Sequence, residues 1–269
     1  MKRTTLFILI NLFLLACEHA EQINLAKLPE PYELRLSKIV QGSQFSIYRY
    51  DDDRNIIKYE FAHGLPGSET LTIYADYFYQ INKLSVVEQY VLLNGQYEKP
   101  GIEEYEYDTQ NRIKRIKYQH RSEIDFSWRS STQEFFYNEH DQVIKTTGSD
   151  GSYVLYYYDA SGNIWKWEGY LFGREYDGPL TITYTYDSHK NPFYLHDIRQ
   201  GILRYFSPNN IIGWESISPE TGEVVARSSS EFEYNSTDYP ISATETVVSP
   251  LTDPQPNTEI FHTAYEYLQ

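Results

Sequence analysis

The stretch Tyr156–Glu168 reads YYYDASGNIWKWE and contains the pattern that decides the fold. Tyr156 and Tyr158 are two positions apart, so their side chains share one face of a β-strand. Asp159 follows at the first position of a four-residue turn, where its side chain can accept the backbone N–H two residues on. A glycine three residues later tolerates a left-handed backbone, and an isoleucine then restarts the alternation of apolar and polar residues. The stretch therefore predicts a β-hairpin.

The same unit, aromatic-x-aromatic followed by a turn residue, returns along the chain. Degenerate copies end at Gln80 and Ser207, and Tyr265-Glu266-Tyr267 forms a last half-unit. Successive turn residues are 20 to 30 positions apart, which is typical of a repeat architecture. The turn positions with the best match to the pattern are Asp51, Asp108, Asn138, Asp159 with Gly162, Asp187 and Asn235.

The residue three positions into each turn refines this prediction. Asn and Asp can adopt a left-handed backbone almost as glycine does, and they stand there in half of the copies, as Asn111, Asp141, Asn210 and Asp238. Arg54 and Lys190 break the rule, and each precedes an Asn. We therefore expect those two turns to be one residue longer.

Eight hairpins imply roughly sixteen strands, and open twisted sheets rarely exceed about ten strands without curling, splitting or closing. Helical periodicity over ten or more residues occurs only near the N-terminus. The sequence therefore predicts an all-β fold: an antiparallel meander of repeated hairpins, rolled into a barrel-like or strongly curved sheet. Residues 32–269 are expected to form a single domain.

The units resemble the YD repeats of Rhs-type proteins, whose pattern is Tyr-Asp-x-x-Gly-Asn/Arg-Leu/Ile. Tyr158–Ile164 fits this pattern fully, and the other copies match it in part. The resemblance covers residues from about 45 to 269. Rhs proteins enclose a toxin in a much longer β-shell, and this chain has neither a toxin domain nor enough length to surround one. The encapsulating role is therefore not implied.

The N-terminus predicts a secreted lipoprotein. A basic start is followed by about ten apolar residues, half of what a spanning helix needs, so residues 1–16 are expected to be a signal peptide. Leu14-Leu15-Ala16-Cys17 resembles a bacterial lipobox, which implies cleavage before Cys17 and a three-chain lipid on its sulfur. Residues 17–31 would then form a tether. Glu18 stands where Asp would favour the inner membrane, so we expect the outer membrane, on its periplasmic or its surface face.

A lipobox together with such repeats resembles a set of Gram-negative, Bacteroides-type outer-membrane lipoproteins with degenerate YD repeats.

The chain's charge limits its partners. It has 23 Lys and Arg against 38 Asp and Glu, which argues against nucleic acid and against a polybasic lipid-binding face. The single Cys excludes a disulfide framework and any multi-cysteine metal site.

The sequence lacks the common catalytic, phosphate-binding and metal-binding motifs. It contains no His-Glu-x-x-His, no phosphate-binding loop and no Gly-x-Ser-x-Gly. Asp51–Asn55 starts like a calcium loop, but Ile56 and Ala62 stand where an EF-hand needs Gly and Glu. His140 and His189 occupy turn positions. We therefore predict no catalytic residue, metal or cofactor, although the paired carboxylates of a glycosidase are set by spatial separation and stay open.

The tryptophans are the remaining candidates for ligand binding. Trp165 and Trp167 are two positions apart on a strand, so they are expected to share one face of it. Two indoles on that face could stack on sugar rings. Alignment with Ile57 and Tyr59 of the first unit instead places them in the core. Trp214 is a third candidate.

Three functions follow, in order of preference. The first is a lipid-anchored envelope protein that is not an enzyme and acts as a binding or scaffold module, with a protein or glycan partner. The second is a glycan-binding surface lipoprotein of a carbohydrate uptake system. The third is an envelope hydrolase.

Overall fold

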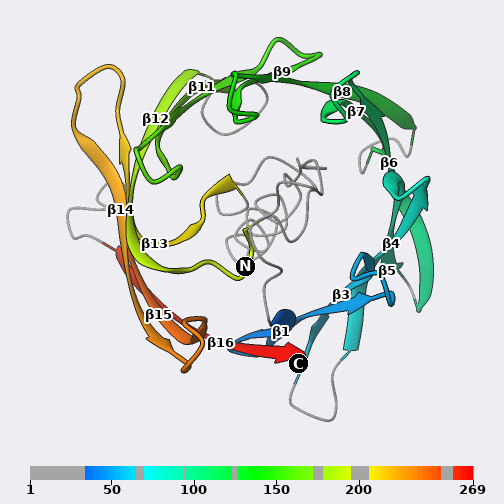
Figure 1. Cartoon of the computed structure of the whole chain (residues 1–269), viewed down its shortest axis with the longest axis horizontal. Helices are drawn as coiled ribbons and strands as arrows, with labels where there is room; N and C mark the ends of the chain where they lie inside the picture. Colours follow the sequence, from blue (N-terminus) through cyan, green and yellow to red (C-terminus); the bar gives the residue numbers. More distant parts are fainter. Residues whose placement is uncertain are drawn as a thin grey trace.

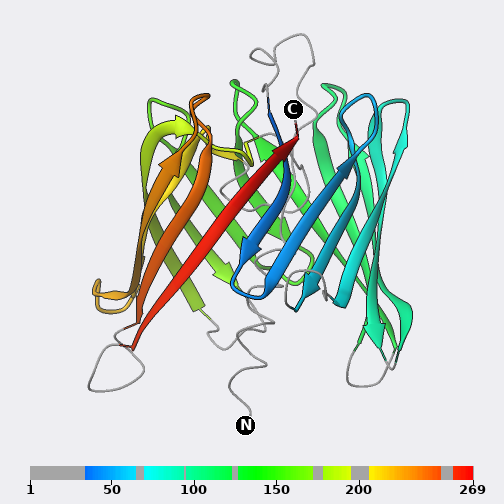
Figure 2. The same ribbon diagram turned by 90° about the horizontal axis from the view of Figure 1, so that it is seen from below.

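A computed structural model describes residues 34–64, 70–93, 95–122, 127–171, 178–194, 206–249 and 257–268. These residues form sixteen antiparallel strands in a closed barrel, seen end-on in Figure 1 and from the side in Figure 2. Each strand pairs with the next along the chain, and the last pairs with the first, so no sheet edge is left open. The prediction of an all-β meander of about sixteen strands is confirmed.

The strands follow one another around the ring in chain order. They are β1 (Arg35–Gln41), β2 (Gln44–Tyr50), β3 (Ile56–His63), β4 (Thr70–Gln80), β5 (Lys83–Leu93), β6 (Gln96–Tyr107), β7 (Ile113–Arg121), β8 (Trp128–Tyr137), β9 (Val143–Gly148), β10 (Tyr153–Tyr158), β11 (Ile164–Leu171), β12 (Gly178–Lys190), β13 (Asn209–Ile217), β14 (Val224–Tyr234), β15 (Pro240–Ser249) and β16 (Asn257–Leu268).

The repeat turns connect each even-numbered strand to the next odd-numbered strand at one end of the barrel, which we call the repeat-turn end. In the turn after β10, Asp159 Oδ1 accepts the backbone N–H groups of Ser161 at 2.8 Å and of Asn163 at 2.9 Å. Gly162 takes the left-handed conformation there, with φ 85°. Asn111, Asp141 and Asp238 adopt it in their own turns, with φ of 73°, 61° and 75°. A single short polar side chain thus closes each of these turns.

The turn after β2 differs from the sequence-based expectation. Arg54 itself takes the left-handed conformation, with φ 74°, and the N–H of Asn55 bonds Asp51 Oδ1 at 2.8 Å. The turn therefore has the ordinary length, and the prediction of an additional residue was wrong. The hydrogen bond to the aspartate stabilises a backbone conformation that arginine rarely adopts.

The turn after β14 allows a direct test of this capping interaction. Asn235 Oδ1 accepts the N–H of Thr237 at 3.0 Å, its hydroxyl at 2.9 Å, and the N–H of Tyr239 at 3.0 Å. Asn235→Ala should lower the free energy of unfolding by about 1–2 kcal/mol, because these donors lose their acceptor. Asn235→Asp keeps an acceptor and should be close to neutral. Urea unfolding followed by circular dichroism would measure both, and equal losses would contradict the capping role.

Next to the repeat-turn end, eight strand pairs each carry a β-bulge, at which one residue is left out of the register. The bulge follows the first residue of the odd-numbered strand in most copies. Ile164 pairs with Tyr158 and Lys166 with Tyr157, so Trp165 has no partner across the ladder. A bulge turns the local side-chain direction. It therefore decides which residues of each unit face inward.

A ring of tyrosines supports the same end of the barrel from inside. In every unit except that of Tyr234, the second tyrosine donates its hydroxyl to the backbone carbonyl of the first or second residue of the preceding odd-numbered strand; Tyr158, for example, bonds the carbonyl of Val143 at 2.9 Å. Burial raises the pKa of Tyr107, Tyr186 and Tyr267, so these phenols stay protonated donors. The donors are Tyr50, Tyr79, Tyr107, Tyr137, Tyr158, Tyr186 and Tyr267.

The inner face of the barrel holds the hydrophobic core. Val87, Ile116 and Ile164 are fully buried, with 0% of each exposed, and the first tyrosines of the units pack among them. Sixteen strands enclose a lumen wider than side chains alone fill. Many inward side chains are accordingly only half-buried, and they line the lumen.

The connection between β12 and β13 departs from the other repeat turns. Asn210 bonds Asp187 through its N–H at 3.0 Å and its amide at 3.1 Å, as Asn163 does with Asp159. Residues 190–209 are therefore an insertion into an ordinary repeat turn, and Asn210 belongs to β13 rather than to a turn of its own. The predicted hairpin at Ser207 does not form, because this residue lies within the insertion.

Both described ends of the insertion turn into the ring (Figure 1). Phe193 packs edge-on against Tyr265 of β16, with ring centroids 6.3 Å apart, and Phe206 packs against Tyr156 of β10 at 6.2 Å. Ser207 is fully buried, accepts the N–H of Ile164 at 3.1 Å and donates to the hydroxyl of Tyr186. One repeat turn thus reaches two separate parts of the barrel wall from within.

Candidate functional site

The outer face of the barrel is charged. Glu88, near the middle of β5, binds Lys99 at 2.7 Å, and Lys166 binds Glu168 at 2.9 Å near the middle of β11. Other outward ion pairs join neighbouring strands: Arg49–Glu60, Lys58–Asp76, Arg115–Glu106, Arg115–Glu134 and Lys117–Glu106.

The carboxylates of Glu88 and Glu106 remain ionised at neutral pH. Hydrogen bonds from Lys99 and Tyr90 lower the pKa of Glu88, and the bond to Glu88 raises the pKa of Tyr90 to about 12. A hydrogen bond from Lys117 likewise lowers the pKa of Glu106. On the lipid side of a membrane barrel, each Lys or Arg at the midplane costs about 2–4 kcal/mol. The outer face of the described strands is therefore suited to water.

The inner wall over β11 to β15 gathers the most distinctive side chains of the lumen. Trp167 donates its indole N–H to the hydroxyl of Tyr184 at 2.7 Å. Trp214 lies directly opposite Tyr184 across the β12–β13 ladder and donates to Glu245 Oε1 at 3.3 Å. All four side chains are half-buried. We call Trp167, Tyr184, Trp214 and Glu245 the lumen row.

The two tryptophans expected to share a face are on opposite faces. Trp167 packs against the inner core, whereas Trp165 is 43% exposed on the outside, 6.4 Å from Tyr157 and covered on one side by Lys166. The bulge at Trp165 breaks the simple alternation. No paired indole platform exists on β11, and Trp167 instead lies on the same inner wall as Trp214 of β13, with Tyr184 between them.

Ser228 lies beside the lumen row on β14, opposite Trp214. Its side chain is buried, with 9% of the residue exposed, and Oγ has no hydrogen-bond partner among the described residues. A buried hydroxyl without a partner is costly and uncommon in folded proteins. This hydroxyl is therefore a candidate ligand contact.

The insertion forms a polar network just beyond the lumen row. The Asn191 amide donates to the carbonyl of Ser207 at 2.8 Å. Asn163 and Asn209 bond each other twice: the Asn163 amide donates to Asn209 Oδ1 at 3.1 Å, and the Asn209 N–H donates to Asn163 Oδ1 at 3.2 Å. These bonds fix the ends of the insertion against the first residues of β11. The lumen row thus has a rigid neighbour on its repeat-turn side.

A second polar cluster lies at the end of β12, where the insertion begins. His189 Nδ1 is 2.6 Å from Asp238 Oδ1, and its ring stacks on Tyr234 with centroids 3.8 Å apart. Tyr234 donates to Asp187, and burial together with that carboxylate raises its pKa. Asp187 is already occupied in closing the turn. The cluster therefore joins two repeat turns, and the described residues contain no group of three or more metal-ligating side chains.

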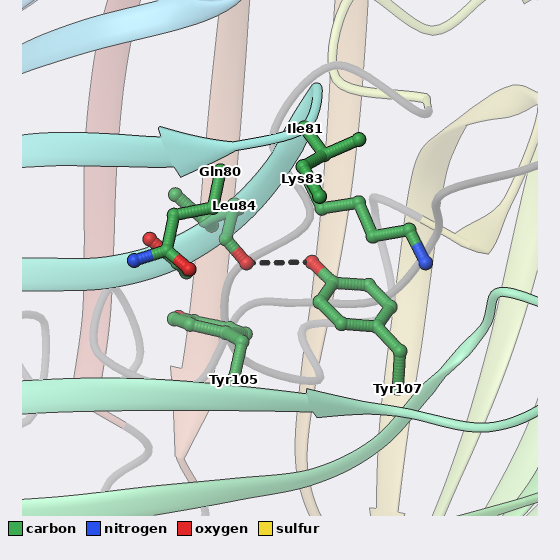
Figure 3. Close-up of a pocket in the computed structure, with 7 residues that line it drawn as sticks. Gln80, Ile81, Lys83, Leu84, Tyr105 and Tyr107 are labelled. Atoms are coloured by element: carbon green, nitrogen blue, oxygen red, sulfur yellow. Dashed lines mark hydrogen bonds between the residues drawn. The ribbon is translucent and has the colours of Figure 1, made fainter.

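A notch opens at the repeat-turn end between β4 and β6. The β4–β5 turn is a tight one, with Ile81 and Asn82 both left-handed, so it is shorter than its neighbours. A cavity of about 300 Å³ lies here, and Figure 3 shows Tyr105 and Tyr107 of β6 along one side of it. Lys83 lies 5.0 Å over the Tyr107 ring, whose hydroxyl bonds the Leu84 carbonyl.

Tyr105, which lines this notch, contacts a buried carboxylate, that of Glu103. Glu103 is 1% exposed, and it accepts hydrogen bonds from Gln89 at 2.6 Å and from Tyr105. Both donors are neutral groups that hold the carboxyl group in place through hydrogen bonds. The pair of Tyr105 and Glu103 connects the notch to the lumen side of β6.

Sequence reasoning did not single out Tyr184, Glu245, Ser228 or Glu103. Their contacts form only between strands that the barrel places side by side. The insertion could have been recognised, because the copy at Ser207 is degenerate and, without it, the turns at Asp187 and Asn235 are farther apart than any other two successive turns. Cys17, the signal peptide and the tether lie outside the described residues. Within the described part of the chain, no helix is long and apolar enough to cross a bilayer.

Comparison with solved structures supports the barrel fold. A porin-like protein from Bacteroides uniformis aligns with 90% of this chain and 99% of its own, at 12% identity and a TM-score of 0.57. A porin-like protein from Bacteroides vulgatus aligns with 88% of this chain and 99% of its own at 12% identity, with a TM-score of 0.41. The complex TcdB2-TccC3-Cdc42 aligns with 81% of this chain and 14% of its own at 12% identity, with a TM-score of 0.33.

Only the first of these scores establishes a shared fold, and at this identity it establishes the fold alone. No protein-family model matches the chain. No curated protein matches it in sequence.

Proposed function

We propose that this protein is a lipid-anchored component of the outer membrane whose barrel stands in water and acts, without catalysis, as a binding or scaffold module. The observation that carries the proposal is the polarity of the barrel, with ion pairs outside and the paired aromatic residues of the repeat units inside. A barrel of this polarity is stable beside a membrane but not within it.

The lipobox residues supply the anchor in this proposal. Two acyl signals already give stable attachment, and the lipid expected on Cys17 has three chains. The described chain begins at residue 34, just before β1. A tether from His19 to Pro31 spans up to ~40 Å when extended, at about 3.3 Å per residue. The barrel can therefore stand clear of the bilayer surface.

The distribution of polar side chains favours binding over catalysis. The acidic and amide residues of the repeats accept backbone N–H groups in their own turns, so they serve the fold. The lumen row, by contrast, offers aromatic surface and hydrogen-bonding groups in a wide interior, which is the composition of a ligand site.

The Bacteroides uniformis neighbour is described as porin-like, which suggests a different role for the shared fold. A pore formed by this chain would need its outer face in lipid. The charges of Glu88, Lys99, Lys117 and Glu168 oppose that arrangement. We therefore propose that the protein is located at the outer membrane and is attached to it by the lipid on Cys17 rather than by the barrel.

The anchor and the barrel can be tested separately. The chain from Glu18 onward, exported behind a cleavable signal without a lipobox, should be recovered in the soluble periplasmic fraction and stay monodisperse without detergent. The wild-type protein should sediment with membranes and incorporate labelled fatty acid, and Cys17→Ser should abolish that labelling. If the chain without its lipid still sediments with membranes and needs detergent, the barrel spans the bilayer and the proposal fails.

A further inference from the structure

We propose that the lumen row binds a neutral carbohydrate, with the indoles of Trp167 and Trp214 against the sugar rings and Glu245 and Ser228 bonding its hydroxyl groups. The inference rests on the proposed function, because it names the ligand class of the same binding module. Its test does not depend on the lipid anchor.

The geometry places the two indoles on one continuous wall. Trp167 belongs to β11 and Trp214 to β13, and Tyr184 of β12 lies between them on the same inner face. Neighbouring strands are about 4.8 Å apart, so the two tryptophan backbones are separated by roughly 10 Å. All three aromatic side chains are half-buried, so each keeps part of its surface open to the lumen.

Hydrogen bonds within the wall fix these rings before any ligand arrives. The indole N–H of Trp167 is used by Tyr184, and that of Trp214 by Glu245. A ring held by the wall loses little conformational freedom on binding, which favours affinity. Both indoles therefore act through their aromatic surface rather than through their N–H groups.

Polar groups on the same wall are left for a ligand. Glu245 uses Oε1 for Trp214, and Oε2 has no partner among the described residues. The Tyr184 hydroxyl accepts from Trp167, and burial raises its pKa, so it keeps a proton to donate. Ser228 Oγ, buried opposite Trp214, has no described partner and can both donate and accept.

These groups select the chemistry of the ligand. Aromatic rings provide apolar, flat surface, and a carboxylate with two hydroxyls provides closely spaced hydrogen-bond partners. A carbohydrate ring combines an apolar face with hydroxyl groups at its edge, so it matches both features. Glu245 and the excess of 38 acidic over 23 basic residues disfavour an anionic ligand, which leaves neutral glycans.

The test uses the mature lipoprotein in mild detergent and four soluble probes: amylopectin, laminarin, galactomannan and arabinoxylan. Affinity gel electrophoresis should show retardation of the wild type by at least one probe, and a tryptophan-fluorescence titration with that probe should give its affinity. Trp214→Leu and Trp167→Leu should each weaken binding roughly ten-fold, the value expected for losing a buried aromatic contact. Trp165→Leu, on the outer face, is the matched control and should bind as the wild type does.

Ser228→Ala keeps the test valid if the tryptophan variants fold poorly. Removing an unpartnered buried hydroxyl should leave the urea midpoint unchanged or raise it, whereas binding to the retarding probe should weaken. Unchanged binding by Ser228→Ala, retardation by none of the four probes, or a loss confined to Trp165→Leu would each overturn the inference. Failure of the membrane anchoring would show in fractionation and not in these measurements.

Discussion

Ile164→Ala is expected to lower the free energy of unfolding by about 2–5 kcal/mol, among the largest effects of any single substitution in this barrel. The side chain is fully buried in the inner core, with 0% exposed. Its backbone also holds the repeat-turn end together, because its N–H bonds Ser207 and its carbonyl accepts from Tyr186. A cavity at this point would loosen the contact between β11 and the insertion.

Trp165→Ala is the matched control, one residue further along the chain. It removes a larger side chain, but Trp165 is 43% exposed on the outer face, where its ring contacts Tyr157 and Lys166. Its cost should be about 1 kcal/mol or less. Urea unfolding of the chain from Glu18 onward, followed by far-ultraviolet circular dichroism, measures both variants. A larger loss for Trp165→Ala would mean that the bulge does not turn this residue outward.

Replacing residues 190–209 by a single glycine should leave a closed barrel that is less stable by on the order of 5 kcal/mol. The variant restores the ordinary repeat turn, because Asn210 keeps its bonds to Asp187. It removes Phe193 and Phe206 from the core, at about 3–5 kcal/mol each. The shorter connection recovers only about 1–2 kcal/mol of loop-closure entropy.

The far-ultraviolet spectrum of this variant should retain its β-sheet signal, while the urea midpoint falls. The double variant Phe193→Ala with Phe206→Ala keeps the full connection and should account for most of the loss. If the glycine variant unfolds at the wild-type midpoint, the ends of the insertion do not contribute to the core. If it loses its β-sheet signal altogether, the insertion is needed for closure.

The repeat units were predictable because their information is local. Asp159, Gly162 and Asn163 form a turn through hydrogen bonds and a left-handed backbone that depend on residues within the same unit. Counting such turns gave sixteen strands, although one of the eight, at Ser207, was an error compensated by the pair of β16 with β1. The closing pair joins the two ends of the domain, and no local pattern marks it.

Alternation along a strand did not predict which side chains near each turn point into the barrel and which point outward. A bulge leaves one residue of each unit out of the register, and only the pairing of two strands shows which one. This explains why Trp165 faces outward and Trp167 inward, although a simple strand would put them together. The lumen row has the same origin, because Trp167, Trp214 and Glu245 meet only after three hairpins are aligned.

By itself, the sequence determined the fold class, the turn chemistry and the expectation of a lipid anchor, because each of these depends on residues close together in the chain. Only the tertiary structure decided that the barrel closes, that its ion pairs face outward and the paired tyrosines of the repeat units inward, and that one repeat turn carries an insertion into the lumen. These features depend on strand register and on contacts between distant segments. A one-residue change in register reverses the facing of a whole strand, so such features are fixed only when the complete ring of strands is assembled.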